Sequence, residues 1–171
     1  MSKKIGALAI AVLAASSQVT LAQTTTTGTM PVSMTVAPIC SVSAAPLSFP
    51  SASFLDVSTD ASSTLTVRCT NGTFYYVTMG LGANATNNPD GRRMKANTDD
   101  FLNYELFTDS ARTTPWLASA TTAPTDSTPV AGIPSAAGNG SNQTINVFGR
   151  VPVQNAVPGS YTDAVTVTLT Y

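Results

Sequence analysis

Apolar and polar residues alternate in two segments near opposite ends of the chain. In residues 30–36, apolar side chains occupy every second position: Met30, Val32, Met34 and Val36. In residues 161–171, the inward-facing set predicted from the same alternation is Tyr161, Val165, Val167, Leu169 and Tyr171. A period of two is that of a β-strand with one buried face. Both segments are therefore predicted to form strands.

The rest of the chain has the same character. Further strands are predicted at residues 65–69, 74–81, 102–107 and 144–153. Asn71-Gly72 is a strong hairpin signal between the first two of these. Residues 51–62 and 118–142 are expected to be loops, the second with a short strand around 130–133. No segment has helical periodicity, so the fold class is an all-β antiparallel sandwich.

The strand at residues 30–36 has two possible uses. It can pair within its own domain as the first strand of the sandwich, or it can be lent to a neighbouring molecule. If it is lent, the strand at residues 161–171 keeps an unpaired edge and an uncovered apolar stripe. Such an edge promotes aggregation unless a partner covers it. The sequence favours the lent strand.

The N-terminus is typical of a secretory signal peptide. Lys3 and Lys4 precede the apolar run 5–15, and small residues allow cleavage after Ala22. The expected organisation is a signal peptide at 1–22, an N-terminal segment at 23–37 and a single domain at 38–171. No other stretch approaches the ~20 apolar residues of a membrane span, so no transmembrane segment is expected after cleavage.

Charged residues are sparse, at 10% of the chain, and this argues against a nucleic-acid partner. Cleavage would leave six basic and nine acidic residues, scattered along the chain. Nucleic-acid-binding proteins carry clustered basic residues. No nucleic-acid partner is therefore expected.

The residue types also argue against catalysis and metal binding. The chain has no histidine, so a Ser-His-Asp or Cys-His arrangement is impossible. Asp99 and Asp100 are adjacent, and are read as a solvated turn. Arg92 and Arg93 are read as exposed loop charges. No enzyme activity, cofactor or metal site is expected.

Cys40 and Cys69 are the two cysteines of the chain. In an exported protein an isolated pair most simply forms one disulfide. Closing this loop would stabilise the fold by about 3.6 kcal/mol on a chain-entropy model.

Several blocks, in order, resemble the spore coat protein U domain family, which includes the pilins of archaic, Csu-like chaperone–usher pili. The blocks are Cys40 with Val42, Leu47 with Phe49, Leu65–Thr73, Leu102–Asp109, Val147–Pro152 and Gly159–Tyr171. The resemblance covers nearly the whole chain after residue 22. It implies an incomplete immunoglobulin-like sandwich that lacks its last strand and is completed by a donor strand from a neighbouring subunit.

In such pili a periplasmic chaperone first fills the gap, and an outer-membrane usher then exchanges it for the N-terminal strand of the next subunit. The donor residues implied here are Met30, Val32, Met34 and Val36. The implied acceptor groove and chaperone contact comprises Tyr161, Val165, Val167, Leu169 and Tyr171. Pro31 departs from an ideal donor because it removes one ladder N–H.

The resulting expectation is a structural subunit of a pilus or fimbria, serving attachment or biofilm formation. It would be exported through the periplasm to the cell surface and joined head-to-tail to identical or related subunits. Two alternatives remain at this stage. One is a self-complemented secreted coat protein, whose N-terminal strand folds back onto its own groove. The other is a carbohydrate-binding adhesin that would use Tyr75, Tyr76 and Trp116.

Overall fold

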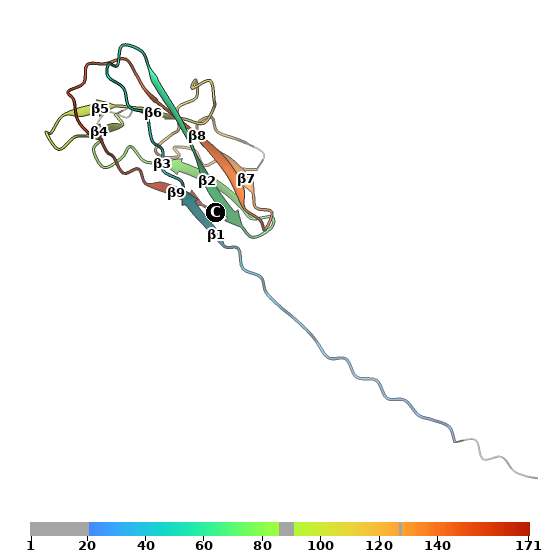
Figure 1. The fold of residues 1–171 in the computed structure, drawn as a ribbon. Coiled ribbons are helices and arrows are strands. Elements are labelled where there is room, and N and C mark those ends of the chain that lie inside the picture. Colours follow the sequence, from blue (N-terminus) through green and yellow to red (C-terminus); the bar gives the residue numbers. More distant parts are fainter. Residues whose placement is uncertain (1–20, 86–90, 127) are drawn as a thin grey trace, which may run out of the picture. The chain divides into compact units, whose positions relative to one another are not determined.

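A computed structural model describes residues 21–85, 91–126 and 128–171 of the chain (Figure 1). It divides into two units, Met1–Thr35 and Val36–Tyr171. Most of the expected signal peptide (1–20) lies outside the described residues. Residues 21–35, the described part of the first unit, contain no helix or strand. Within the described ranges, no helix is long and apolar enough to cross a membrane.

The second unit contains the nine strands of the described residues. They are β1 (Cys40–Ala44), β2 (Thr59–Cys69), β3 (Phe74–Met79), β4 (Arg93–Lys95), β5 (Phe101–Asn103), β6 (Glu105–Phe107), β7 (Ser135–Ala137), β8 (Gln143–Val151) and β9 (Val167–Thr170). A four-stranded sheet has the order β1-β2-β8-β6, a three-stranded sheet the order β7-β3-β9, and β4 pairs with β5. Every strand pairing is antiparallel.

The two larger sheets bury their apolar faces in one core. Leu65 and Val67 of β2 and Val147 of β8 contribute from the four-stranded sheet, and Tyr75 and Val77 of β3 from the three-stranded sheet. All five side chains are buried. The prediction of an all-β antiparallel sandwich is confirmed.

The pairing of β2 with β8 is the longest ladder of the unit. It runs from Thr59 opposite Val151 to Val67 opposite Gln143, and Figure 1 shows the two strands as long neighbours. β2 therefore extends from one end of the unit to the other, about 34 Å at 3.4 Å per residue. Its N-terminal end lies beside the end of β8, and its C-terminal end beside the start of β1.

Several predicted boundaries were wrong. The expected loop at 51–62 contains the first four residues of β2, because that polar stretch pairs with β8. Residues 102–107 form two strands, since β5 pairs with β4 whereas β6 pairs with β8. In the 118–142 segment, Val130 and Ile133 form only an isolated bridge, and the strand is β7 at Ser135–Ala137. The small side chains of β7 give no alternating signal.

The reading of Arg92 as an exposed charge was also wrong. Its side chain is 3% exposed and forms an ion pair with Glu105 at 2.6 Å. The guanidinium also donates to the carbonyls of Gly80 (3.1 Å), Met79 (2.6 Å) and Trp116 (2.9 Å). Burial is tolerated because these acceptors satisfy the charge. Arg93 belongs to β4, and its guanidinium lies 3.8 Å from the centroid of the Phe101 ring.

Candidate functional site

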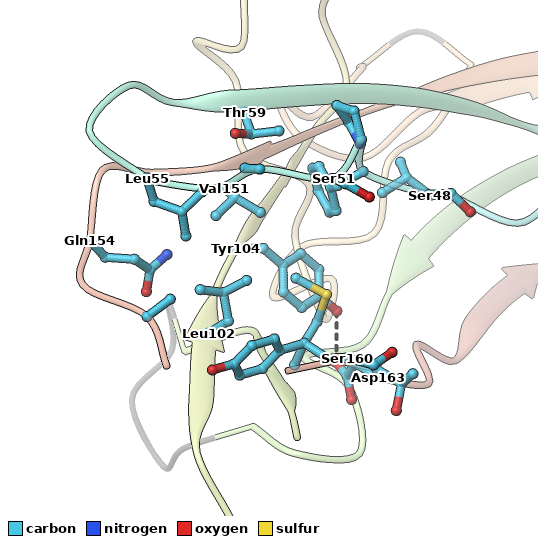
Figure 2. Close-up of a pocket in the computed structure, with 18 of the residues that line it drawn as sticks. Ser48, Ser51, Leu55, Thr59, Leu102, Tyr104, Val151, Gln154, Ser160 and Asp163 are labelled. Atoms are coloured by element: carbon cyan, nitrogen blue, oxygen red, sulfur yellow. Dashed lines mark hydrogen bonds between the residues drawn. The ribbon is translucent and has the colours of Figure 1, made fainter. Parts of the chain in front are cut away.

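The principal cavity of the described residues opens along one side of the sandwich. Its volume is about 1310 Å³. One wall is the segment 44–56, which follows β1, and the opposite wall is the segment 153–167, which leads into β9. Figure 2 shows Ser48, Ser51 and Thr59 on one side of this space and Ser160 and Asp163 on the other, with Tyr104 between them. The cavity thus lies between the segment that follows one edge strand, β1, and the segment that leads into another, β9.

The floor of the cavity is the hydrophobic core itself. Buried side chains from both larger sheets line it, namely Leu65, Met79, Leu106, Val147 and Val151. Leu47, Phe49 and Leu55, which are partly buried, pack against this core from the first wall. A core reached through an open side is expected to take up an apolar partner.

β9 and the residues before it form an edge at which every second residue turns its backbone N–H and C=O groups away from β3. Gly80 donates to the carbonyl of Thr166, and Ala83 donates to the carbonyl of Ala164. Backbone groups of successive residues in an antiparallel strand face opposite sides. The N–H and C=O groups of Val165, Val167 and Leu169 therefore point away from β3. Among the described residues no further strand pairs with β9 on that side.

The edge formed by β1 has the matching arrangement. Ile39 accepts from the N–H of Thr70, and Ala45 donates to the carbonyl of Thr64. By the same alternation, the backbone groups of Val42 and its neighbours at 40 and 44 face away from β2. No strand of the described residues pairs with β1 on that side. Two edges thus present unpaired backbone groups above an apolar floor, which is the environment of a missing strand.

A hydrogen-bonded pair of side chains links the floor of the cavity to one of its walls. The hydroxyl of Tyr104 donates to Asp163 Oδ2 at 2.7 Å, drawn as a dashed line in Figure 2. Asn84 donates to the other carboxylate oxygen through its backbone N–H (3.2 Å) and its side chain (3.0 Å). Burial, together with the bond to Asp163, raises the pKa of Tyr104 above its ordinary value. The phenol therefore stays neutral and holds the Asp163 segment against the core.

The structure places the predicted acceptor residues in three locations. Tyr161, Val165 and Val167 line the cavity. Leu169 packs against the core from β9 but does not line the cavity. Tyr171 lines a separate hollow of about 480 Å³.

Sequence reasoning did not assign the wall at 44–56 to the site. Leu47 and Phe49 do alternate, and that alternation was the available signal. Leu102 and Tyr104 also line the cavity. They were read only as members of a strand.

The residues of the predicted donor strand are exposed. The exposed fractions are 81% for Met30, 88% for Val32, 90% for Met34 and 67% for Val36. Large apolar side chains at alternate positions are seldom left in water together. Their role as a donor strand stays a prediction.

The predicted disulfide is confirmed. Cys40 and Cys69 are bonded, with their Cα atoms 4.1 Å apart. They are also direct partners in the register of β1 and β2. The bond therefore fixes the start of β1, one edge of the gap, to the core strand β2.

The aromatic residues considered for sugar binding lie mainly inside the protein. Tyr75 and Trp116 are each 1% exposed, and the Trp116 indole N–H donates to the carbonyl of Val77 at 3.2 Å. Buried rings cannot stack on a sugar, so these two residues play a core role. Within the described ranges, no group of three or more His, Cys, Asp or Glu side chains is placed to hold a metal ion.

Comparisons with known proteins agree with this architecture. A crystal structure of the CsuC–CsuE chaperone–tip adhesion subunit pre-assembly complex, from the archaic chaperone–usher Csu pili of Acinetobacter baumannii, contains a chain of similar fold. The TM-score is 0.54 at 24% identity, over 80% of this chain and 41% of that chain. The present chain thus matches less than half the length of that chain. No curated protein was found to match. The sequence model of the Spore Coat Protein U domain matches residues 26–168, and the chain therefore belongs to the Spore Coat Protein U domain family.

Proposed function

We propose that this chain is a structural subunit of a chaperone–usher pilus, joined to its neighbours by donor-strand exchange. The observation that carries the proposal is the gap between the edges of β1 and β9, whose unpaired backbone groups border an open apolar core. An extended strand from another chain supplies both the missing hydrogen bonds and the missing apolar side chains.

The segment at residues 30–36 has the composition such a strand requires. Its four alternating apolar side chains are exposed in their own subunit. Burying them at about 1.5–3 kcal/mol each would contribute roughly 6–12 kcal/mol to joining. Pro31 lacks an N–H, so we place effective pairing from Val32 onward.

Local chain geometry argues against the self-complemented coat protein. Ile39 is already hydrogen-bonded to Thr70 through both its N–H and its carbonyl. Only Ala37 and Pro38 are left to reverse the chain after Val36. Two-residue hairpin loops require positive φ at their first or both positions, which Ala disfavours and Pro forbids. The strand is therefore better suited to a neighbouring subunit than to its own.

The proposal includes a pathway and a location. The signal peptide at 1–22 directs export, a periplasmic chaperone protects the gap, and an outer-membrane usher exchanges the chaperone for the next donor strand. The product is a head-to-tail surface fibre that serves attachment or biofilm formation. Related subunits can enter the same fibre.

The proposal is tested by supplying the strand in cis. The mature chain is produced without residues 23–37, with or without a copy of residues 29–37 fused after Tyr171 through a flexible linker. We expect the fused chain to be a monomer in light scattering and to unfold at a much higher temperature than the unfused chain. The unfused chain should aggregate, or stay in solution only while it is bound to a chaperone.

The matched control carries Val32→Asp and Met34→Asp in the fused copy. This control should behave like the unfused chain, because a carboxylate in an apolar groove is not compensated. If the unfused chain is monomeric and as heat-resistant as the fused one, the sandwich is complete without a donor and the proposal is wrong.

A further inference from the structure

Two loops at one end of the second unit expose large apolar side chains. Phe54 is 81% exposed, Val57 67%, Val153 61% and Val157 50%. They flank the start of β2 and the end of β8, which are paired through Thr59 and Val151. The N–H of Gln154 donates to the carbonyl of Leu55 at 3.1 Å and ties the two loops together. We call Phe54, Val57, Val153 and Val157 the apolar rim.

A second apolar surface lies at the other end of β2. There a hollow of about 480 Å³ is lined by Val36, Pro38, residues 70–73, Phe74 and Tyr171. Tyr171 is 58% exposed. We call Pro38, Phe74 and Tyr171 the basal hollow, and leave out Val36 because it belongs to the donor segment. The length of β2 separates it from the apolar rim by about 34 Å, so the two surfaces of one subunit cannot meet.

The open end of the gap lies at the apolar rim. Three residues of the apolar rim, Phe54, Val153 and Val157, also line the principal cavity. At the other end the lining stops at Ala44, the last residue of β1, and Val167, the first residue of β9. A neighbouring subunit whose strand fills the gap therefore meets this subunit at the rim.

The connection between the donor strand and its own domain is short. Val36 ends the apolar stripe and Cys40 begins β1. Four fully extended residue steps span at most about 14 Å. When Val36 is seated in a groove, the basal hollow of the donor subunit must lie within that reach of the groove's mouth.

We propose that the apolar rim of one subunit packs against the basal hollow of the next, as a second contact beside the donor strand. This inference rests on the proposed function, and its occupant is a second copy of this chain. The contact is heterologous, with different surfaces on the two partners, so it repeats along a fibre without closing. It explains why both ends of the unit expose apolar side chains.

The test uses a photo-cross-linking residue at the rim. Polymers are assembled from full mature chains in which Phe54, or in a second protein Val57, is replaced by p-benzoylphenylalanine. The control carries the same residue at Asn146, an exposed position in the middle of β8. After irradiation, boiling in detergent dissociates every pair that is not covalently linked.

We expect a cross-linked dimer from the rim positions and none from position 146. Mass spectrometry should place the link in residues 36–39, 70–74 or 171 of the second chain. If the wild-type and the rim-labelled chains both polymerise but the rim-labelled polymers give no such dimer, the second contact is overturned and strand exchange stands. Absence of polymers from the wild-type chain would overturn strand exchange and, with it, this contact.

Discussion

Two stretches of this chain carry the same alternating pattern but lie in different environments. In residues 30–36 the apolar side chains are 67–90% exposed and form no strand. In residues 161–169 the odd-numbered side chains are partly buried against the core, while the even-numbered ones are exposed. The second stretch is paired on one edge only. A period of two thus predicts that one face is buried, but it does not say which molecule buries it.

The same contrast separates the two sides of the sandwich. On the closed side, β2 lies between β1 and β8 and its core residues are almost inaccessible. On the open side, β1 and β9 each pair with one strand, and the core is reached through the cavity. Substitutions in the two stretches and on the two sides should therefore have different consequences.

The largest expected effect separates the two alternating stretches. Val32→Asp with Met34→Asp should abolish joining of subunits but leave chaperone capture intact, because the acceptor groove is unchanged. Val167→Asp should instead abolish chaperone capture, so that the subunit is degraded before assembly. The reason is that it puts a carboxylate on the apolar edge of that groove. Each variant is tested by co-purification with the chaperone and by counting surface fibres. Loss of chaperone binding in the Val32/Met34 variant would mean that the strand belongs to its own fold.

The next effect concerns the closed part of the fold. Arg92→Met removes a buried cation and leaves the Glu105 carboxylate and three carbonyls without their donor. Breaking a buried pair in this way costs about 3–5 kcal/mol. Arg93→Met is the matched control, with a cost of about 1–2 kcal/mol for the lost contact with Phe101 and the lost hydrogen bond to the carbonyl of Asn84. Urea unfolding of the chain with the fused donor strand measures both; equal losses would contradict the assigned role of Arg92.

The alternation predicted the fold class and the strands of the core, because buried apolar side chains dominate that signal. It failed at β7, where Ser135, Ala136 and Ala137 have no large side chains to alternate. It also failed at Arg92, because burial of a charge depends on carbonyls from β3 and from Trp116 that are distant in sequence. Pairing partners of this kind are set by the tertiary fold.

The groove was only partly predictable for a related reason. Tyr161, Val165 and Val167 were found because they alternate within one strand. The opposite wall at 44–56 is irregular, and only the three-dimensional arrangement brings it to the same cavity. Leu169 was assigned to the groove together with the rest of its strand, whereas in the structure it packs against the core without lining the cavity.

A smaller effect is expected from the disulfide, which connects the open side to the closed side. Replacing both cysteines, as Cys40→Ala with Cys69→Ala, should lower the free energy of unfolding by about 3–4 kcal/mol through the entropy of the unfolded chain. It should also weaken chaperone capture, because β1 is one edge of the gap. Mass spectrometry of alkylated samples checks the bond first. Two alkylatable thiols in the unreduced wild-type protein would contradict it.

The smallest expected effect lies on the closed side, where Asp60 of β2 faces Arg150 of β8. Two hydrogen bonds from Arg150, at 2.7 and 2.8 Å, hold the pKa of Asp60 below its ordinary value, and Arg112 adds to the attraction. A carboxyl with a lowered pKa in the fold contributes stability above its unfolded pKa. That stability is lost as the pH falls through the folded pKa. The pair is partly exposed, so the contribution should stay under about 1 kcal/mol. Urea unfolding of the chain with the fused donor strand, between neutral pH and pH 3, should show a steeper acid loss for the wild type than for Asp60→Asn. Equal acid losses in the two proteins would contradict a contribution of this pair to stability.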